Sequence, residues 1–149
     1  MTTVDAPQVS VADSQELRDE WLGRLDRLTQ SVQGWAEELG WSTRRIDKRM
    51  EDSQLGNYQA PALLLQAEFV RLLLEPIARF APGTEGVVDL YQMPAYDDIA
   101  SLFFCDGEWR VYFVFPGSSA IFTKEVATSP PLSRETIQKV LEHMRQHGA

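Results

Sequence analysis

Cysteine and histidine are scarce in this sequence, which has one cysteine, Cys105, and two histidines among 149 residues. A single cysteine forms no internal disulfide and no cysteine-rich zinc site, so we expect a reducing, cytoplasmic environment. Apolar runs are also short, far below the roughly 20 residues that a membrane span requires. The first residues lack the basic and apolar regions of a secretory signal. The sequence therefore predicts no membrane association.

Basic side chains are the minority charge. The chain has 14 Lys and Arg residues against 22 Asp and Glu residues, for a net charge of −8, which argues against nucleic acid as a partner. Hydrophobic residues make up 44% and charged residues 24%, as in ordinary globular proteins, and the length suffices for one core. We expect a flexible arm at residues 1–12 and a single domain at residues 13–149.

One long amphipathic helix is predicted near the N-terminus. Apolar residues recur three and four positions apart, at Leu17, Trp21, Leu25, Leu28, Val32, Trp35 and Leu39. Asp13, with Glu16 three residues later, is the expected N-cap, and Gly40 is the expected stop.

A short second helix is predicted at residues 134–147. Ser133 is its expected cap, and Leu132 has the spacing to contact Ile137 across the first turn. Two prolines, Pro130 and Pro131, prevent the helix from extending upstream.

Between the helices the pattern changes to alternation, which predicts a mainly antiparallel meander of about four to seven strands. The expected strands are residues 41–50, 61–67, 69–78, 87–93, 99–105 and 108–115, with a further edge strand at 120–126 and a loop at 51–60. Asp106 and Gly107 have the composition of a tight hairpin turn. The fold class is therefore α+β.

Residues 61–80 have two interpretations. Leu65, Phe69 and Leu72 share helical spacing, which would suit one helix. Pro76 would lie inside that helix and would remove a backbone hydrogen bond, at a cost of about 3 kcal/mol. This cost favours two strands joined near residues 66–68.

Three carboxylates are the candidate catalytic residues: Glu75, Asp89 and Glu108. A carboxylate within an apolar strand such as the one at Asp89 needs a partner, which can be a bound metal, a nearby arginine such as Arg79 or Arg110, or solvent. The order of these acids resembles that of restriction-endonuclease-like nucleases, which implies a divalent cation between adjacent strands. Arg110 stands where that family has a lysine.

Weaker candidates for metal binding lie outside this group. Asp97 and Asp98 are adjacent acids in a turn-rich segment, where solvated side chains are the alternative. His143 and His147 are four residues apart on the second helix, where cationic side chains also suit the end of a helix. No confident metal site and no cofactor are predicted.

Four basic residues lie close together at Arg44, Arg45, Lys48 and Arg49. In an acidic protein such a patch suits a phosphate, a carboxylate ligand or an acidic partner surface. On a strand, alternation divides the patch between the two faces, and a charged edge strand that resists pairing is the alternative.

Aromatic and basic residues of the sheet suggest a binding surface. The candidate binding residues are Arg79, Tyr91, Tyr96, Trp109, Arg110 and Tyr112. If one face of the 99–115 hairpin packs against helices, we expect the other face to show Phe104 and Tyr112.

The function that these patterns favour is a small, non-catalytic interaction protein whose partner is another protein or a second copy of the chain. One alternative is a divalent-metal-dependent hydrolase or nuclease-like enzyme that uses Glu75, Asp89 and Glu108. Another is a module that binds a small ligand in a pocket lined by Trp109, Tyr91 and Arg79.

Overall fold

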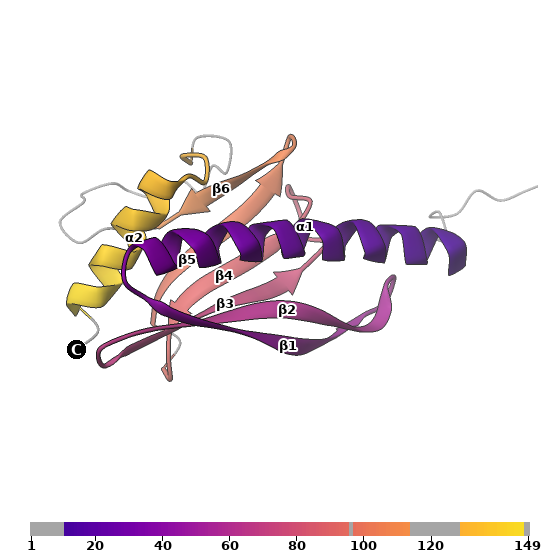
Figure 1. Ribbon diagram of the computed structural model, residues 1–149. Coiled ribbons are helices and arrows are strands. Elements are labelled where there is room, and N and C mark those ends of the chain that lie inside the picture. The colour runs from indigo at the N-terminus through magenta and orange to yellow at the C-terminus, as the bar shows by residue number, and fades with distance from the viewer. Residues whose placement is uncertain (1–10, 96, 114–128, 148–149) are drawn as a thin grey trace, which may run out of the picture.

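The computed structural model describes residues 11–95, 97–113 and 129–147 (Figure 1). Its elements follow one another as α1 (Val11–Glu38), β1 (Ser42–Asp52), β2 (Gly56–Ala67), β3 (Val70–Ala78), β4 (Val87–Gln92), β5 (Asp97–Cys105), β6 (Glu108–Tyr112) and α2 (Arg134–His147). The predicted α+β class, with a long first helix, an antiparallel meander and a short last helix, is confirmed. The predicted strand at 120–126 lies outside the described residues.

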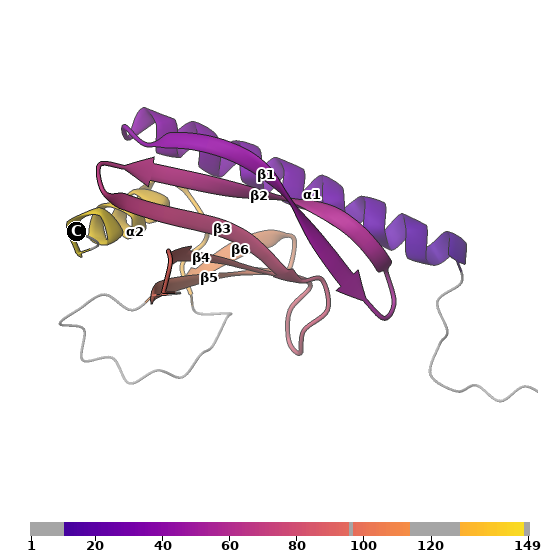
Figure 2. The same ribbon diagram turned by 90° about the horizontal axis from the view of Figure 1, so that it is seen from below.

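The six strands form one antiparallel sheet in the order β1-β2-β3-β4-β5-β6. Both helices pack against the same face of this sheet (Figures 1 and 2). Apolar side chains of α1, α2 and the covered sheet face make one continuous core, whose largest fully buried members include Trp21, Leu63, Leu90 and Leu141. We call the opposite face of the sheet the second face. Among the described residues, no helix is long and apolar enough to cross a membrane.

The helix α1 is anchored on the sheet by Trp21, which is fully buried. Its indole Nε1 donates a hydrogen bond to the Tyr58 hydroxyl at 3.0 Å. Its ring also lies over Gly86, where a Cβ would come within 2.5 Å of the indole. Position 86 therefore has room for glycine alone unless the ring moves.

Two strands, and not one helix, occupy residues 61–80, as Pro76 favours. Ala67 pairs with Val70, so Glu68 and Phe69 form a two-residue turn. Glu68 takes a φ of 57°, a backbone conformation that glycine usually supplies in such turns. The single-helix alternative is wrong, because these residues belong to β2 and β3. Glu68 takes the place that glycine usually has in the turn between them.

The predicted loop at residues 51–60 is wrong, because β2 already begins at Gly56. The β1–β2 connection is short because the Asp52 Oδ1 atom accepts hydrogen bonds from the backbone N–H groups of Gln54 and Leu55, at 2.6 and 2.8 Å. Gly56, with a φ of 77°, completes the reversal. The side chain of Asp52 thus closes a turn that sequence composition assigned to a longer loop.

The two helix starts differ in how well the sequence predicts them. Helix α1 begins at Val11, two residues before its expected cap Asp13. Helix α2 begins at Arg134 as expected, and the Ser133 Oγ atom accepts a hydrogen bond from the Thr136 backbone N–H at 3.1 Å. Ile137 is fully buried in the core.

The expectation that Phe104 lies on the second face is wrong. The turn at Asp106 and Gly107, both with positive φ, pairs Phe104 with Trp109, so the two rings share the helix-covered face. Their centroids are 5.2 Å apart, edge to face. Tyr112 pairs with Ser101 and lies on the second face, as expected.

Candidate functional site

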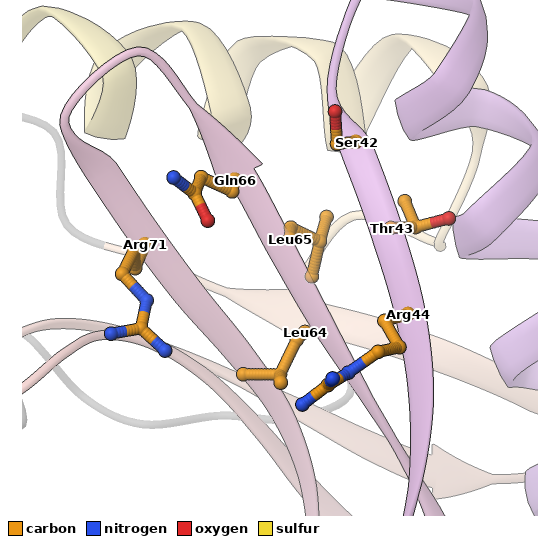
Figure 3. A pocket seen from close by; sticks show the side chains of 7 residues that line it. All are labelled: Ser42, Thr43, Arg44, Leu64, Leu65, Gln66 and Arg71. Carbon is orange, nitrogen blue, oxygen red and sulfur yellow. The ribbon is translucent and has the colours of Figure 1, made fainter.

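Two arginines, from strands β1 and β3 on either side of β2, flank a pocket at one end of the sheet (Figure 3). Strand pairing places Arg44 of β1 beside Leu64 of β2, and Gln66 of β2 beside Arg71 of β3. The pocket between them has a volume of about 320 Å³ and is also lined by Ser42, Thr43 and Leu65. We call it the Arg44–Arg71 pocket.

Both arginines are exposed, and neither side chain makes an ion pair or a hydrogen bond within the described ranges. Two cationic groups at the rim of one pocket, in a chain of net charge −8, create a local positive potential. Guanidinium groups donate several hydrogen bonds in a planar arrangement that matches carboxylates. The pocket is therefore suited to an anionic group.

The other three residues of the predicted basic patch do not line the pocket. Arg45 forms an ion pair with Asp26 of α1 on the helix-covered face. Lys48 turns to the second face, and exposed Arg49 belongs to the helix-covered side of β1. Strand alternation divides these residues between two faces, so only Arg44 reaches the pocket.

The hairpin that carries Arg71 also has an exposed aromatic ring at its tip. Phe69, at the tip of the β2–β3 turn, is 89% exposed, the largest value among the described large hydrophobic residues. Arg71 follows it by two residues. The neighbouring Glu68 carboxylate is paired with Arg145 of α2 at 3.1 Å, which offsets its negative charge. This end of the sheet thus combines positive charge with apolar surface.

The candidate acids Glu75 and Asp89 face each other across β3 and β4 on the second face. The Lys48 ammonium lies 3.2 Å from Glu75 Oε2 and donates a hydrogen bond to the Pro76 carbonyl at 2.7 Å. The Tyr91 hydroxyl donates to Glu75 Oε1 at 3.0 Å. Glu75 therefore has Lys48 as its ion-pair partner, and not Arg79 or Arg110.

Asp89 is 7% exposed and accepts a hydrogen bond from the Ser101 hydroxyl at 3.0 Å. The third candidate, Glu108, lies at the start of β6, where its carboxylate pairs with Arg110. Tyr112, four residues further along β6, is the residue in line with Asp89 and Ser101. The structure thus brings two of the three acids together and places Glu108 apart. Within the described part of the chain, no group of three or more His, Cys, Asp or Glu residues has the geometry of a metal site.

This network has one clear electrostatic signature. The pKa of Tyr91 is raised to about 12, first by burial and then by the hydrogen bond to Glu75 and the charges of Glu75 and Asp89. A phenolate at this position would face two carboxylates. Tyr91 therefore acts as a hydrogen-bond donor and stays protonated.

The three residues expected to line a small-ligand pocket are separated by the sheet. Trp109 lies in the core, 6.4 Å from the Trp21 ring, and Arg79 lies near Glu20 of α1 with its guanidinium 4.9 Å from the Phe80 ring. Tyr91 lies on the second face. These side chains do not line one pocket.

The remaining candidates are dispersed. Arg110 donates a hydrogen bond to the Ser129 carbonyl at 2.8 Å and holds the segment before α2 against β6. His143 packs edge to face on the Phe113 ring at 5.3 Å. Tyr96 and the side chains of Asp97 and His147 lie outside the described residues, and Asp98 occupies a positive-φ position in β5.

Sequence reasoning missed Arg71, the second arginine of the pocket. Its position follows only from the register of the β2–β3 hairpin, which places residue 71 opposite residue 66, with β2 between it and β1. A turn fixed at residues 68 and 69 would have supplied that register. Comparisons with protein-family models, with curated proteins and with solved structures found no match for this chain.

Proposed function

We propose that this protein is a non-catalytic binding protein that holds an acidic segment of a partner protein at the Arg44–Arg71 pocket. The observation that carries the proposal is the pair of exposed guanidinium groups around a pocket of about 320 Å³, without ion-pair partners among the described residues. Carboxylates of a bound segment would supply the missing partners.

A peptide segment suits this site better than an isolated small anion. Half-buried Leu64 lines the pocket, and Phe69 is exposed at the nearby hairpin tip. An extended segment with acidic and apolar residues could contact the arginines and this apolar surface together. Charge-assisted hydrogen bonds from arginine contribute about 1.5–3 kcal/mol each when they are sheltered and less at an open surface.

The acids of the second face offer less support for catalysis. Glu75 is bonded to Lys48 and Tyr91, and Asp89 to Ser101, so their oxygens serve a polar network that joins β1, β3, β4 and β5. Glu108, which the hydrolase alternative also needs, lies at the opposite end of β6 from Tyr112. We therefore do not propose a hydrolase that uses these acids.

The proposal is tested by the binding of a labelled polyglutamate peptide, followed by fluorescence anisotropy at low salt. The double variant Arg44→Gln/Arg71→Gln is expected to weaken binding at least about tenfold, equivalent to about 1.4 kcal/mol. Binding to the wild-type chain should also fall steeply as salt rises.

The matched control is Arg27→Gln/Lys139→Gln, which also removes two exposed positive charges, one from α1 and one from α2, away from the pocket. It should leave the affinity within about twofold of wild type. An equal loss in the control, or equal binding of a polyglutamine peptide, would reduce the effect to general electrostatics and refute a pocket-specific site. Inorganic phosphate that displaces the peptide at equal concentration would point to a small anion as the ligand instead.

A further inference from the structure

The two edges of the sheet are treated differently. At the β6 edge, the segment before α2 pairs with the strand: Arg110 bridges to Pro131, and the Val111 N–H donates to the Pro130 carbonyl. At the other edge, β1 pairs with β2 alone, and its outer side runs for 11 residues along the margin of the sheet (Figure 2). No described element pairs with this outer side. Such an edge is a template for a further strand.

Charges along β1 are ordered. Its first charged residues are Arg44 and Arg45, Asp47 precedes Lys48 and Arg49 at its centre, and it ends with Glu51 and Asp52. A second copy of β1 placed parallel to the first would set like charges opposite one another. An antiparallel copy sets the basic start against the acidic end. The strand is thus complementary to its own reversed copy.

Symmetry restricts the register of such a pair. In a twofold dimer with a continuous sheet, the helix-covered faces of both copies lie on the same side, and opposed residues share a face. Opposed residues of β1 must therefore be both even-numbered or both odd-numbered. It follows that one residue always lies opposite its own copy, and each choice of that residue defines one register.

Charge selects one of these registers. With Lys48 opposite itself, Asp47 faces Arg49, Arg45 faces Glu51 and Arg44 faces Asp52. The Lys48 charge is already offset by Glu75 at 3.2 Å. This register aligns residues 44–52 and gives three kinds of opposite-charge pair, each present twice. Arg45 already pairs with Asp26, and Asp52 already closes the β1–β2 turn, so Asp47 with Arg49 is the pair whose two members both lack an ion pair among the described residues.

The neighbouring registers are worse. Centring on Asp47 sets Arg45 against Arg49, and centring on Arg49 sets Asp47 against Glu51. Centring on Ile46 sets Arg44 against Lys48. Centring on Met50 avoids like pairs but leaves only residues 48–52 opposed. Like charges directly opposite one another destabilise a strand pair.

We propose that the protein forms a twofold dimer by antiparallel pairing of β1 with β1 of a second copy, centred on Lys48. Asp47 and Arg49 are the pair that defines it. Both are exposed, and neither has an ion pair or a side-chain hydrogen bond among the described residues. The dimer does not rest on the proposed binding of an acidic segment, but it sets Asp52 of the second copy opposite Arg44, so a bound segment would compete with this outermost pair.

Charge exchange tests the register by sedimentation velocity. The wild type is expected to be dimeric at about 100 µM, and Asp47→Arg or Arg49→Glu alone should weaken the dimer at least about tenfold. The double variant Asp47→Arg/Arg49→Glu restores both pairs and should dimerise within about threefold of wild type. An equimolar mixture of the two single variants should form a heterodimer, because each then supplies the charges that the other needs. Lys139→Glu changes the charge by the same amount as Arg49→Glu, but at an exposed position on α2. It should leave the dimer unaffected.

A crosslink locates the axis independently. In a Cys105→Ser background, Lys48→Cys should give a disulfide-linked dimer under mild oxidation, since opposed Cα atoms lie about 4.5–5.5 Å apart. Met50→Cys, which would face Ile46, should not. A monomeric wild type, a dimer indifferent to the single charge changes, or singles that the mixture does not rescue would each overturn the proposal. A crosslink through Met50→Cys in place of Lys48→Cys would overturn this register.

Discussion

At the scale of single residues, the polar network of the second face explains how carboxylates are accommodated within a sheet. Glu75 and Asp89 lie opposite each other, and two like charges at this distance would repel. Lys48 offsets one of them, and Tyr91 and Ser101 each donate a hydrogen bond. The two carboxylates therefore persist in the fold because side chains of β1, β4 and β5 supply their partners.

Tyr91 is expected to make the free energy of unfolding fall as the pH becomes alkaline. Its pKa is about 12 in the folded chain, against about 10 when the chain is unfolded. Its contribution to stability is therefore constant below pH 10 and is lost as the pH rises from about 10 to about 12, where the unfolded state releases the proton first. Tyr91→Phe removes this contribution. The free energy of unfolding in urea should thus fall less between about pH 9 and 11 in Tyr91→Phe than in wild type, and parallel curves would contradict the assignment.

The sequence revealed these acids but not their partners. Asp89 stood out because it interrupts apolar neighbours, a pattern that demands compensation. Lys48 lies 27 residues before Glu75 on a strand two places away in the sheet, so its pairing depends on the register of both β1 and β2. Sequence spacing contains no such information, and the nearer Arg79 turns instead to Glu20 on the other face.

At the scale of elements, the contact of α1 with β4 depends on the size of one residue. Gly86→Ala would place a Cβ 2.5 Å from the buried Trp21 ring, so the ring or the strand must shift. Overpacking of this kind costs about 1–3 kcal/mol. We expect Gly86→Ala to lower the free energy of unfolding by that amount in urea denaturation.

The matched control lies on the same helix. Gly34 has open space around it, and alanine there should stabilise α1 by up to about 1 kcal/mol. The two glycine-to-alanine changes are thus expected to act in opposite directions. Equal small effects would show that the Trp21 ring moves aside without cost.

Prediction succeeded for elements whose signals are local and failed where one side chain changes a turn. Period and capping located α2 to its residues, and Pro76 alone decided between a helix and a hairpin in residues 61–80. The β1–β2 turn was misplaced because Asp52 shortens it through two backbone hydrogen bonds. The face of Phe104 was misassigned because it follows from pairing with Trp109 across a two-residue turn.

At the scale of the whole molecule, charge of one sign opposes folding. A net charge of −8 repels itself more strongly in the compact state than in the expanded chain. The ion pairs are mostly at the surface, where each contributes little. Added salt screens both the net repulsion and the ion pairs. The stability gained from weaker repulsion should therefore exceed the stability lost from weaker ion pairs.

Raising NaCl from about 10 mM to about 150 mM shortens the screening length from about 30 Å to about 8 Å. We expect the melting temperature to rise by a few degrees over this range, and KCl should act alike because ionic strength is the variable. The measurement should include Asp47→Arg, so that self-association does not contribute. A melting temperature that falls with salt would mean that the ion pairs outweigh the repulsion.

The sequential strand order also determines how the chain can be built during synthesis. Each strand finds its partners among its immediate predecessors and successors, so hairpins can join one at a time as the ribosome releases them. Helix α1 is synthesised before any of them. The Trp21 side chain gains its contact with Gly86 only after the chain has been synthesised as far as β4. Ile137 and Leu141 of α2 complete the same interior last. Nascent chains halted before α2 would consequently display an unfinished interior, the state in which chaperones bind growing polypeptides.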